Sequence, residues 1–358
     1  MGRRLVAATW ALGLTVQAAP PPAKPVEPVA GMLEAFRTHS IVAMAEGDHG
    51  NEQAHAFRLS LIRDSRFPTI VNDIVVEFGS ARYQDVMDRF VRGEAVPDET
   101  LRQVWQNTTQ PTTVWDLPIY EEFFRAVRSV NASLPRDRQM RVLLGDPPID
   151  WDAVHTREDL GRQQADMARD RYPADLIRRE VVARNRRALV IYGDGHLQCR
   201  DRLINFERSD PTARLLLMRL ESEPAVSVFS IWTTTATNLS ALQDDVSSWP
   251  TPTLTIVRGT RLGAADATAY APGEAPRFAN GPGGPDFSSP LPRDRWRALR
   301  MEDQFDAVLY LGPPSAMTMS RVPPLLCRDS AYMNMRVQRL TIAGMTRQID
   351  QLKRYCGQ

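Results

Sequence analysis

The sequence predicts an α/β fold with a largely parallel central sheet flanked by helices. Short apolar runs typical of buried strands alternate with segments of helical period, which favours parallel strands joined by helical connections. The chain has 358 residues, 43% of them hydrophobic, so it can bury a large core. The expected strands cover residues 40–45, 73–78, 140–144, 188–192, 226–232, 254–257 and 305–311.

Helical segments occupy the intervals between these strands. Three of them lie between the second and third strands, and they predict a helical insertion over about residues 81–135. A helix through Leu220 and a last helix from about 331 to 355 follow. Residues 263–292 are rich in Gly and Pro and have no periodicity, so we expect a long loop there.

The N-terminus has the pattern of a secretory signal peptide. Arg3 and Arg4 precede a short apolar run, and small residues suit cleavage after Ala18. We therefore expect a signal peptide over 1–18, a proline-rich tether over 19–30 and a single domain over 31–358, exported to the periplasm or secreted. No later segment reaches 18 apolar residues, so the mature chain is expected to lack a transmembrane segment. An uncleaved membrane anchor is the alternative.

Charge and cysteine content narrow the class of protein. The formal net charge is +1, with acidic and basic residues interleaved, which suggests neither a nucleic acid nor a polycation as partner. The expected partner, a small-molecule substrate, rests on the strand-end residues and the family resemblance described below. In an exported chain, Cys327 and Cys356 flank the last helix and are the expected disulfide, with Cys199 left over. The sequence carries no signal for an oligomeric state.

Polar residues stand at the ends of four successive expected strands. Carboxyl ends of parallel strands meet at one edge of a sheet, where α/β proteins bind ligands. These side chains should therefore converge on one site. They are Glu46, Asp48 and His49 after the first strand, Glu77 at the end of the second, Asp146 after the third and His196 after the fourth.

Arg58 is a second, independent signal. If a helix begins near Gly50, then Arg58 falls within its apolar stripe and faces the sheet. A buried guanidinium needs an anionic partner, because an unpaired buried charge is very costly. Glu46 and Glu77 are the expected partners.

These residue types suit two kinds of chemistry. In the first, a glutamate orients an imidazole that takes a proton from water, and cationic groups stabilise the resulting oxyanion. In the second, a divalent metal is held by Glu46, His49, Glu77 and His196. The sequence has no Gly-x-Ser-x-Gly elbow and no phosphate-binding Gly-rich loop, and "GDGHLQ" lacks the third glycine of a dinucleotide fingerprint. A serine nucleophile is therefore not expected.

With these residues assembled, the chain resembles the erythromycin esterase family, within the wider superfamily that includes the ChaN, TraB and Tiki proteins. The resemblance covers about residues 41–198. It rests on "AEGDHG" with Glu46 and His49, on Arg58, on "IVVEFG" with Glu77, on "VWDLPIYEEFFRAVRSVN", on "RVLLGD" with Asp146 and on "YGDGHLQ" with His196.

The resemblance implies a hydrolase of an ester, lactone or related carbonyl bond that needs no cofactor. It implies His49 as general base, Glu46 and Glu77 as orienting carboxylates, and Arg58 and His196 as electrostatic stabilisers. Asp48 and Asp146 are expected to contact the substrate. A ChaN-like relationship would instead imply a non-catalytic protein that binds haem, a metal or another small ligand. A Tiki- or TraB-like relationship would imply a metal-dependent hydrolase.

Overall fold

A computed structural model describes residues 19–166, 169–197, 215–224, 226–234, 246–265, 277–281, 284–290 and 300–357. Within this part of the chain, an eight-stranded sheet has the order β1-β7-β10-β6-β2-β5-β3-β4. Its parallel strands are β2 (Ile41–Ala45), β3 (Asp73–Ser80), β4 (Arg141–Asp146), β5 (Ala188–Tyr192), β6 (Val228–Thr234) and β10 (Ala307–Tyr310). At one edge, β7 (Thr253–Ile256) pairs antiparallel with β10, and β1 (Pro25–Val26) pairs antiparallel with β7. The expected largely parallel sheet is confirmed.

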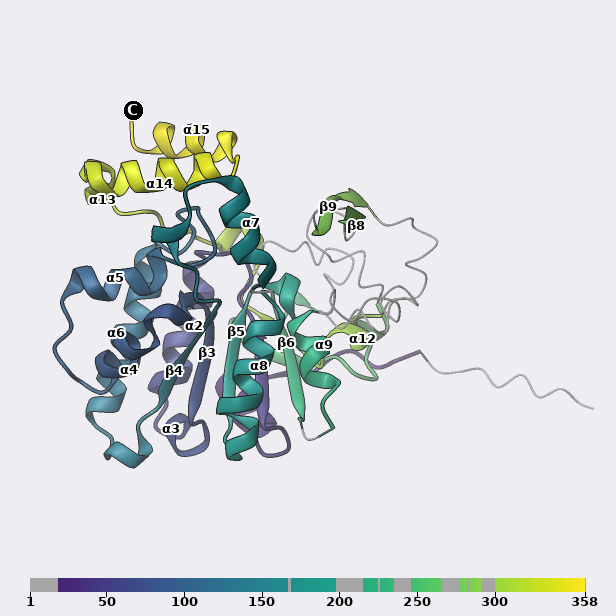
Figure 1. Cartoon of the computed structure of the whole chain (residues 1–358). Coiled ribbons are helices and arrows are strands. Elements are labelled where there is room, and N and C mark those ends of the chain that lie inside the picture. The colour runs from purple at the N-terminus through teal and green to yellow at the C-terminus, as the bar shows by residue number, and fades with distance from the viewer. Residues whose placement is uncertain are drawn as a thin grey trace, which may run out of the picture.

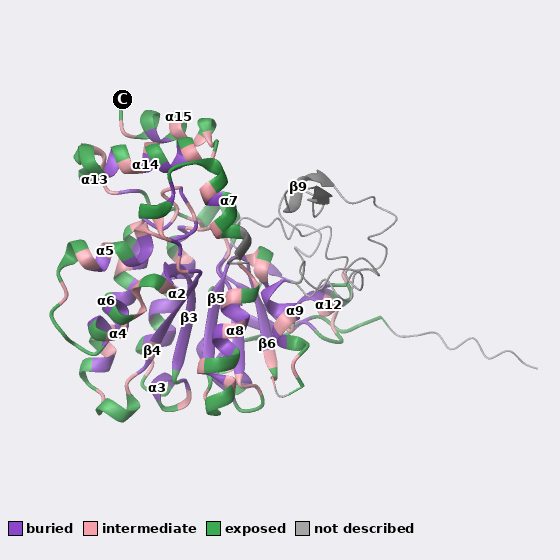
Figure 2. Cartoon of the chain, viewed as in Figure 1, coloured by how far each residue is buried: buried purple, intermediate pink, exposed green. Residues whose placement is uncertain are grey.

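Helices cover both faces of the sheet (Figure 1). The first face packs against α1 (Pro28–Ala35), α2 (Glu52–Arg63), α4 (Gln84–Val91), α5 (Asp98–Gln106) and α6 (Pro118–Ala132), and the second against α8 (Arg171–Glu180) and α9 (Leu216–Glu221). Alternation along β2 explains the two layers, because Val42 and Met44 join the first core while Ile41 and Ala43 join the second. Every residue of β2 is buried, as a central parallel strand requires. Its neighbours β3 and β5 are buried along their whole length as well (Figure 2).

The expected helical insertion between the second and third parallel strands of the sequence is present. It consists of η1 (Ala81–Tyr83), α4, α5 and α6, and it ends before η2 (Arg136–Arg138) and β4. The remaining helical elements before the C-terminal region are α3 (Phe67–Ile70), η3 (Trp151–Ala153), α7 (Arg157–Asp166), η4 (Val182–Arg184), η5 (Asp194–His196), α11 (Arg261–Ala264), α12 (Met301–Gln304) and η11 (Pro314–Ala316).

The C-terminal region differs from the single last helix that the sequence predicts. It forms α13 (Pro324–Arg328), α14 (Ser330–Ile342) and α15 (Thr346–Tyr355), which lie beyond the carboxyl edge of the sheet (Figure 1). Gly344 between α14 and α15 has φ 72°, a left-handed conformation that ends a helix, which accounts for the break. The expected disulfide joins Cys327 to Cys356, with their Cα atoms 5.2 Å apart. Cys199 lies outside the described residues.

Two expected segments need correction. The tether over 19–30 is only partly a tether, because Pro25–Val26 pairs with β7 and Pro28 begins α1. The pairing of β1 with β7 joins segments that are distant in sequence, so the proline content of the tether could not reveal it. The expected loop over 263–292 contains β8 (Arg277–Gly281) and β9 (Gly284–Pro290), which pair antiparallel. Residues 263 and 264 belong to α11, whereas residues 266–276, 282–283 and 291–292 of that loop and the expected signal peptide over 1–18 lie outside the described residues. No described helix is both long enough and apolar enough to cross a bilayer.

Candidate functional site

Glu46, His49 and Glu77 meet at the carboxyl edge of the sheet. One ligand atom from each lies within 4.8 Å of the others. Strand register explains the meeting: Ala45 on β2 pairs with Tyr192 on β5, and Val76 on β3 pairs with Ile191. Glu46, Glu77 and the start of the loop after β5 therefore reach the same level of the edge. The expected convergence of strand-end residues holds for these three, and His196 lies beside them with Nε2 3.3 Å from Oε1 of Glu77.

The turn between β2 and α2 presents His49 to this site. Gly47 and Gly50 have φ 73° and 92°, values that only glycine adopts without strain, and they allow the chain to reverse within four residues. Asn51 then caps α2 by accepting the backbone N–H of Ala54 at 2.8 Å. The backbone of Gly50 also accepts an N–H from Ser320 at 2.8 Å, which fastens the turn to the chain before α13.

Glu46 holds both His49 and Arg58. Nδ1 of His49 lies 2.9 Å from Oε2 of Glu46, and Nη1 of Arg58 lies 3.5 Å from Oε1. The side chains of Glu46 and Arg58 are 0% and 2% exposed, so this is a fully buried ion pair. Arg58 thus has the anionic partner that its place in the helical stripe predicts. The guanidinium of Arg58 contacts Glu46 and is buried, so it is not exposed to solvent in the site.

His49 is half-buried, and its ring packs edge to face on Trp115 with centroids 4.7 Å apart. Burial alone would lower the pKa of His49, but the carboxylate of Glu46, helped by Glu77 and Asp194, raises this pKa to about 9. With Nδ1 directed to Glu46, Nε2 makes no hydrogen bond to any described residue. His49 therefore offers one ring nitrogen to a ligand or water.

Glu77 is 3% exposed and is surrounded by donors. Its Oε2 accepts the backbone N–H of Gly193 at 2.7 Å, and its Oε1 accepts from Arg169 Nη2 at 2.6 Å and lies 3.3 Å from His196 Nε2. Burial opposes the charge of Glu77, but His196, Arg169 and His49 more than offset it and hold the pKa of this carboxyl well below its usual range. Glu77 is therefore an anion that anchors the groups around it. A β-carbon at Gly193 would lie 3.2 Å from both Glu77 Oε2 and His49 Cε1, so a side chain at this position would press on both groups.

His196 lies between two carboxylates. Its Nδ1 is 2.7 Å from Oδ1 of Asp170, and its Nε2 faces Glu77. Burial would lower the pKa of His196, but Asp170 and Glu77 raise it to about 10. The imidazole is therefore a cation at neutral pH, with both nitrogens engaged.

Asp48 and Asp146, the expected substrate contacts, are placed differently from each other. Asp48 is exposed in the turn beside His49. Asp146 is 2% exposed, and its two oxygens accept the backbone N–H and the hydroxyl of Thr109 at 2.6 and 2.5 Å. Burial raises the pKa of Asp146 to about 7, although Arg169 and Thr109 oppose the rise. Asp146 thus joins the end of β4 to the loop between α5 and α6.

Sequence reasoning missed four contributors to the site. Arg169 and Asp170 lie between α7 and α8, where the sequence carries no periodicity or motif that marks them. Asp194, which accepts the backbone N–H of Gly47 at 3.1 Å, sits in the same strand-end motif as His196 and could have been found by the same rule. Trp115 lies in the "VWDLPIYEEFFRAVRSVN" segment that carries part of the family resemblance, but only the fold places its ring against His49.

Several buried polar atoms around the site have no hydrogen-bond partner among the described residues. They include Trp115 Nε1, Tyr120 Oη, Tyr192 Oη and Glu46 Oε1. Burial raises the pKa of Tyr120 and Tyr192 well above the usual tyrosine value, with Glu46 adding to the effect at Tyr120 and Glu77 at Tyr192. Both hydroxyls are therefore neutral donors that a water or ligand can satisfy. Tyr192 Oη would lie 2.0 Å from a β-carbon at Gly145, so only glycine fits at that position.

The same residues can be tested as a metal centre. Two carboxylates and an imidazole suit a divalent cation in type and in mutual distance. However, Glu46 is already paired with Arg58, and Glu77 with Arg169 and His196. A metal bound here would therefore compete with the cationic partner of each carboxylate. The types of the ligand atoms suit a divalent metal, but the negative charge of both carboxylates is already balanced by protein cations.

No protein-family model matches the chain, and no curated protein matches its sequence. Several solved structures do match its fold. A protein from Bacillus cereus has a TM-score of 0.52 at 12% identity, over 84% of this chain and 97% of its own. A succinoglycan biosynthesis protein has a TM-score of 0.53 at 10% identity, over 84% and 96%. A histidine-to-asparagine variant of the erythromycin esterase EreC, in its open conformation, has a TM-score of 0.52 at 12% identity, over 82% and 95%. At these identities the chain shares the fold of an esterase structure.

Proposed function

We propose that the protein is a hydrolase of an ester, lactone or related carbonyl bond, in which His49 activates water. The observation that carries this proposal is the contact of His49 Nδ1 with the buried Glu46 at 2.9 Å, which leaves Nε2 open on a half-buried ring. A carboxylate that orients one ring nitrogen and frees the other is the arrangement that general-base catalysis requires. The shared fold with an esterase supports the same reading.

The remaining residues have separate roles in this proposal. Arg58 neutralises Glu46 from the buried side, so it positions the carboxylate and does not touch the substrate. Glu77 fixes the backbone of Gly193 next to His49. Arg169, whose side chain is 34% exposed, is the cation best placed to stabilise an oxyanion, and His196 supports it through Glu77.

The raised pKa of His49 has a consequence for the reaction. At about 9, it means that the imidazole is mostly protonated at pH 7 and that only a minor fraction can accept a proton from water. The base that does form is stronger for the same reason. We therefore expect a hydrolase that is most active in alkaline solution.

A metal-dependent hydrolase is the second candidate, because the ligand atoms of Glu46, His49 and Glu77 lie within 4.8 Å of one another. A divalent ion held there would supply Lewis acidity, and His49 would then hold the ion instead of taking the proton. A non-catalytic protein that binds haem or another small ligand is the alternative from another class. Export to the periplasm is part of the proposal, and the disulfide Cys327–Cys356 supports it because such bonds persist in oxidising compartments.

The test is turnover of a panel of activated esters and lactones by the wild-type chain and by His49→Ala. We expect His49→Ala to lower kcat by about 10²- to 10⁴-fold, since proton transfer is lost while packing is kept. His155→Ala, at an exposed histidine outside the site, is the matched control and should leave kcat unchanged. Loss of activity with a chelator would assign the metal-dependent reaction. No turnover, together with stoichiometric retention of haem or metal through His49, would contradict the hydrolase.

A further inference from the structure

A second cavity lies at the amino ends of the parallel strands, whereas the candidate site lies at their carboxyl ends. It has a volume of about 330 Å³ and is formed by the end of α4, η2, η4 and the start of β4. Five arginines and two aspartates line it: Arg92, Arg136, Arg141, Arg184, Arg186, Asp88 and Asp137. Asp73 is the first residue of β3 and lies at the same amino end of the sheet as the cavity. Glu77 of the candidate site is four residues further along β3, roughly 13 Å away in an extended strand, and the two sites share no side chain.

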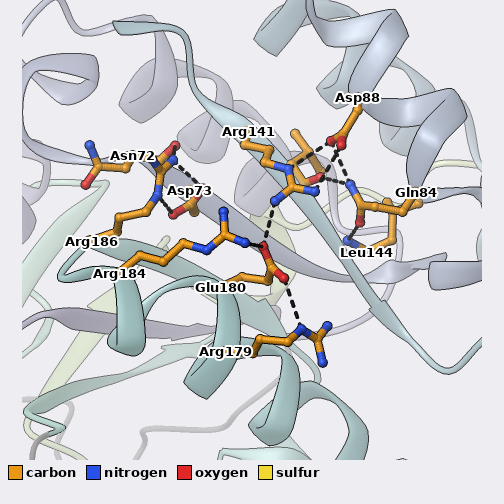
Figure 3. A network of polar contacts seen from close by, with 11 residues as sticks. Asn72, Asp73, Gln84, Asp88, Arg141, Leu144, Arg179, Glu180, Arg184 and Arg186 are labelled. Carbon is orange, nitrogen blue, oxygen red and sulfur yellow. Dashed lines mark hydrogen bonds and ion pairs between the residues drawn. The ribbon is translucent and has the colours of Figure 1, made fainter. Parts of the chain in front are cut away.

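A network of ion pairs fixes three of these guanidinium groups (Figure 3). Arg141 binds both oxygens of Asp88 at 3.0 Å and one oxygen of Glu180 at 2.9 Å. Arg184 pairs with the same Glu180 at 3.0 Å, and Figure 3 shows Arg141, Arg184 and Arg179 reaching Glu180 from different directions. Because these arginines are already held, a ligand that binds them orders few new side chains.

Arg186 is also held by a carboxylate, and one of its nitrogens remains without a hydrogen-bond acceptor among the described residues. Its Nε and Nη2 bind the two oxygens of Asp73 at 2.5 and 2.7 Å, while its Nη1 makes no hydrogen bond to a described residue. Arg92 and Arg136 are exposed and have no carboxylate within ion-pair distance in the described part of the chain. The lining therefore carries more positive than negative charge, and it includes N–H donors that the protein does not use.

We propose that this cavity binds a small anion that bears phosphate groups. Guanidinium groups donate paired hydrogen bonds that match the oxygens of a phosphate, and several held together favour a ligand of more than one negative charge. The volume lies at the lower end of the range of small-molecule sites, which suits a pyrophosphate or a sugar phosphate. Arg136 belongs to the sequence "RDR" at the start of the segment 136–151, and the proposed hydrolysis assigns no role to these three residues.

The experiment is calorimetric titration of the full chain with inorganic pyrophosphate. We expect saturable binding at one site that weakens as salt is raised. Arg92→Ala and Arg136→Ala should each weaken it about tenfold, as the loss of one charge-assisted contact predicts. Both residues are exposed and without a described ion pair, so both variants should fold. Arg347→Ala removes the same charge from the exposed side of α15 and should bind pyrophosphate as the wild type does.

The outcomes separate this site from the catalytic one. Ester hydrolysis should be the same in Arg136→Ala as in the wild type, because the cavity and His49 lie at opposite edges of the sheet. A phospholipid headgroup offers the same chemistry, so sedimentation with phosphatidic acid vesicles is a second arm; vesicle binding that Arg92→Ala and Arg136→Ala weaken would assign the phosphate to a lipid. Binding to neither probe, or equal weakening by Arg136→Ala and Arg347→Ala, would overturn the proposal.

Discussion

Oδ1 of Asp170 lies 2.7 Å from Nδ1 of His196 and also accepts the backbone N–H of Leu216 at 2.8 Å. On the other side of the imidazole, Nε2 is 3.3 Å from Oε1 of Glu77. His196 thus connects the chain before α8 to the carboxylate that holds Gly193 beside His49. Asp170 acts on the site only through His196, which makes it a positioning residue.

Asp170→Asn should lower the pKa of His196 from about 10, because it removes a negative charge while keeping the shape of the side chain. We expect kcat to fall about tenfold with little change in KM, since His196 supports Glu77 and does not contact substrate. NMR titration of the imidazole measures the pKa directly. Asp175→Asn, which removes an exposed partner of Arg178 on α8, is the control and should change neither quantity. An unchanged His196 pKa in Asp170→Asn would contradict this role.

The pH dependence of hydrolysis should follow His49. Because its pKa is raised to about 9, chiefly by Glu46 acting against burial, the neutral imidazole that accepts a proton accumulates only above pH 8. We expect kcat/KM to rise from pH 7 through a midpoint near pH 9 and to level off above about pH 10. Glu46→Gln should move the midpoint of the profile to lower pH. A profile that is flat or falls between pH 7 and 9 would show that another group is the base.

Stability should change with pH in the opposite sense. The pKa values of His49 and His196 in the folded protein, about 9 and about 10, both exceed the unfolded value of 6.5, so the folded state binds more protons above pH 6.5. Their contribution is fully present below pH 6.5 and is lost as the pH rises through 9 and 10. The free energy of unfolding in urea should therefore fall between pH 6.5 and 10.

His155→Ala should keep this slope, since it removes an exposed histidine. His49→Gln should reduce it by removing one of the two shifted groups. A free energy of unfolding that rises over the same pH range would mean that neither imidazole is held as a cation.

Strand ends were the part of the site that the sequence could predict. The β5 strand occupies 188–192 as expected, and its neighbours on β2 and β3 place Glu46 and Glu77 beside its end. Short apolar runs and the rule for parallel sheets contain that information. Arg169 and Asp170 could not be found this way, because they lie in a connection without periodicity and reach Glu77 and His196 only through the packing of α8 on the sheet. The same limit applies to β1, whose pairing with β7 joins residues more than two hundred positions apart.

The pair of Arg58 and Glu46 gives the sharpest test of the buried charges. Arg58→Ala should lower the free energy of unfolding by about 3–5 kcal/mol, because it removes the cation that faces Oε1 of Glu46 where both side chains are at most 2% exposed, and leaves the carboxylate with His49 alone as its cationic partner among the described residues. Arg37→Ala is a matched control: the nitrogen and oxygen of the Arg37–Glu34 pair are also 3.5 Å apart, but these side chains are 74% and 68% exposed. Its loss should stay below about 1 kcal/mol. Urea unfolding at pH 7 measures both. Equal losses in the two variants would mean that Glu46 does not carry its charge in the folded protein, and the orientation of His49 by a carboxylate would then have to be abandoned.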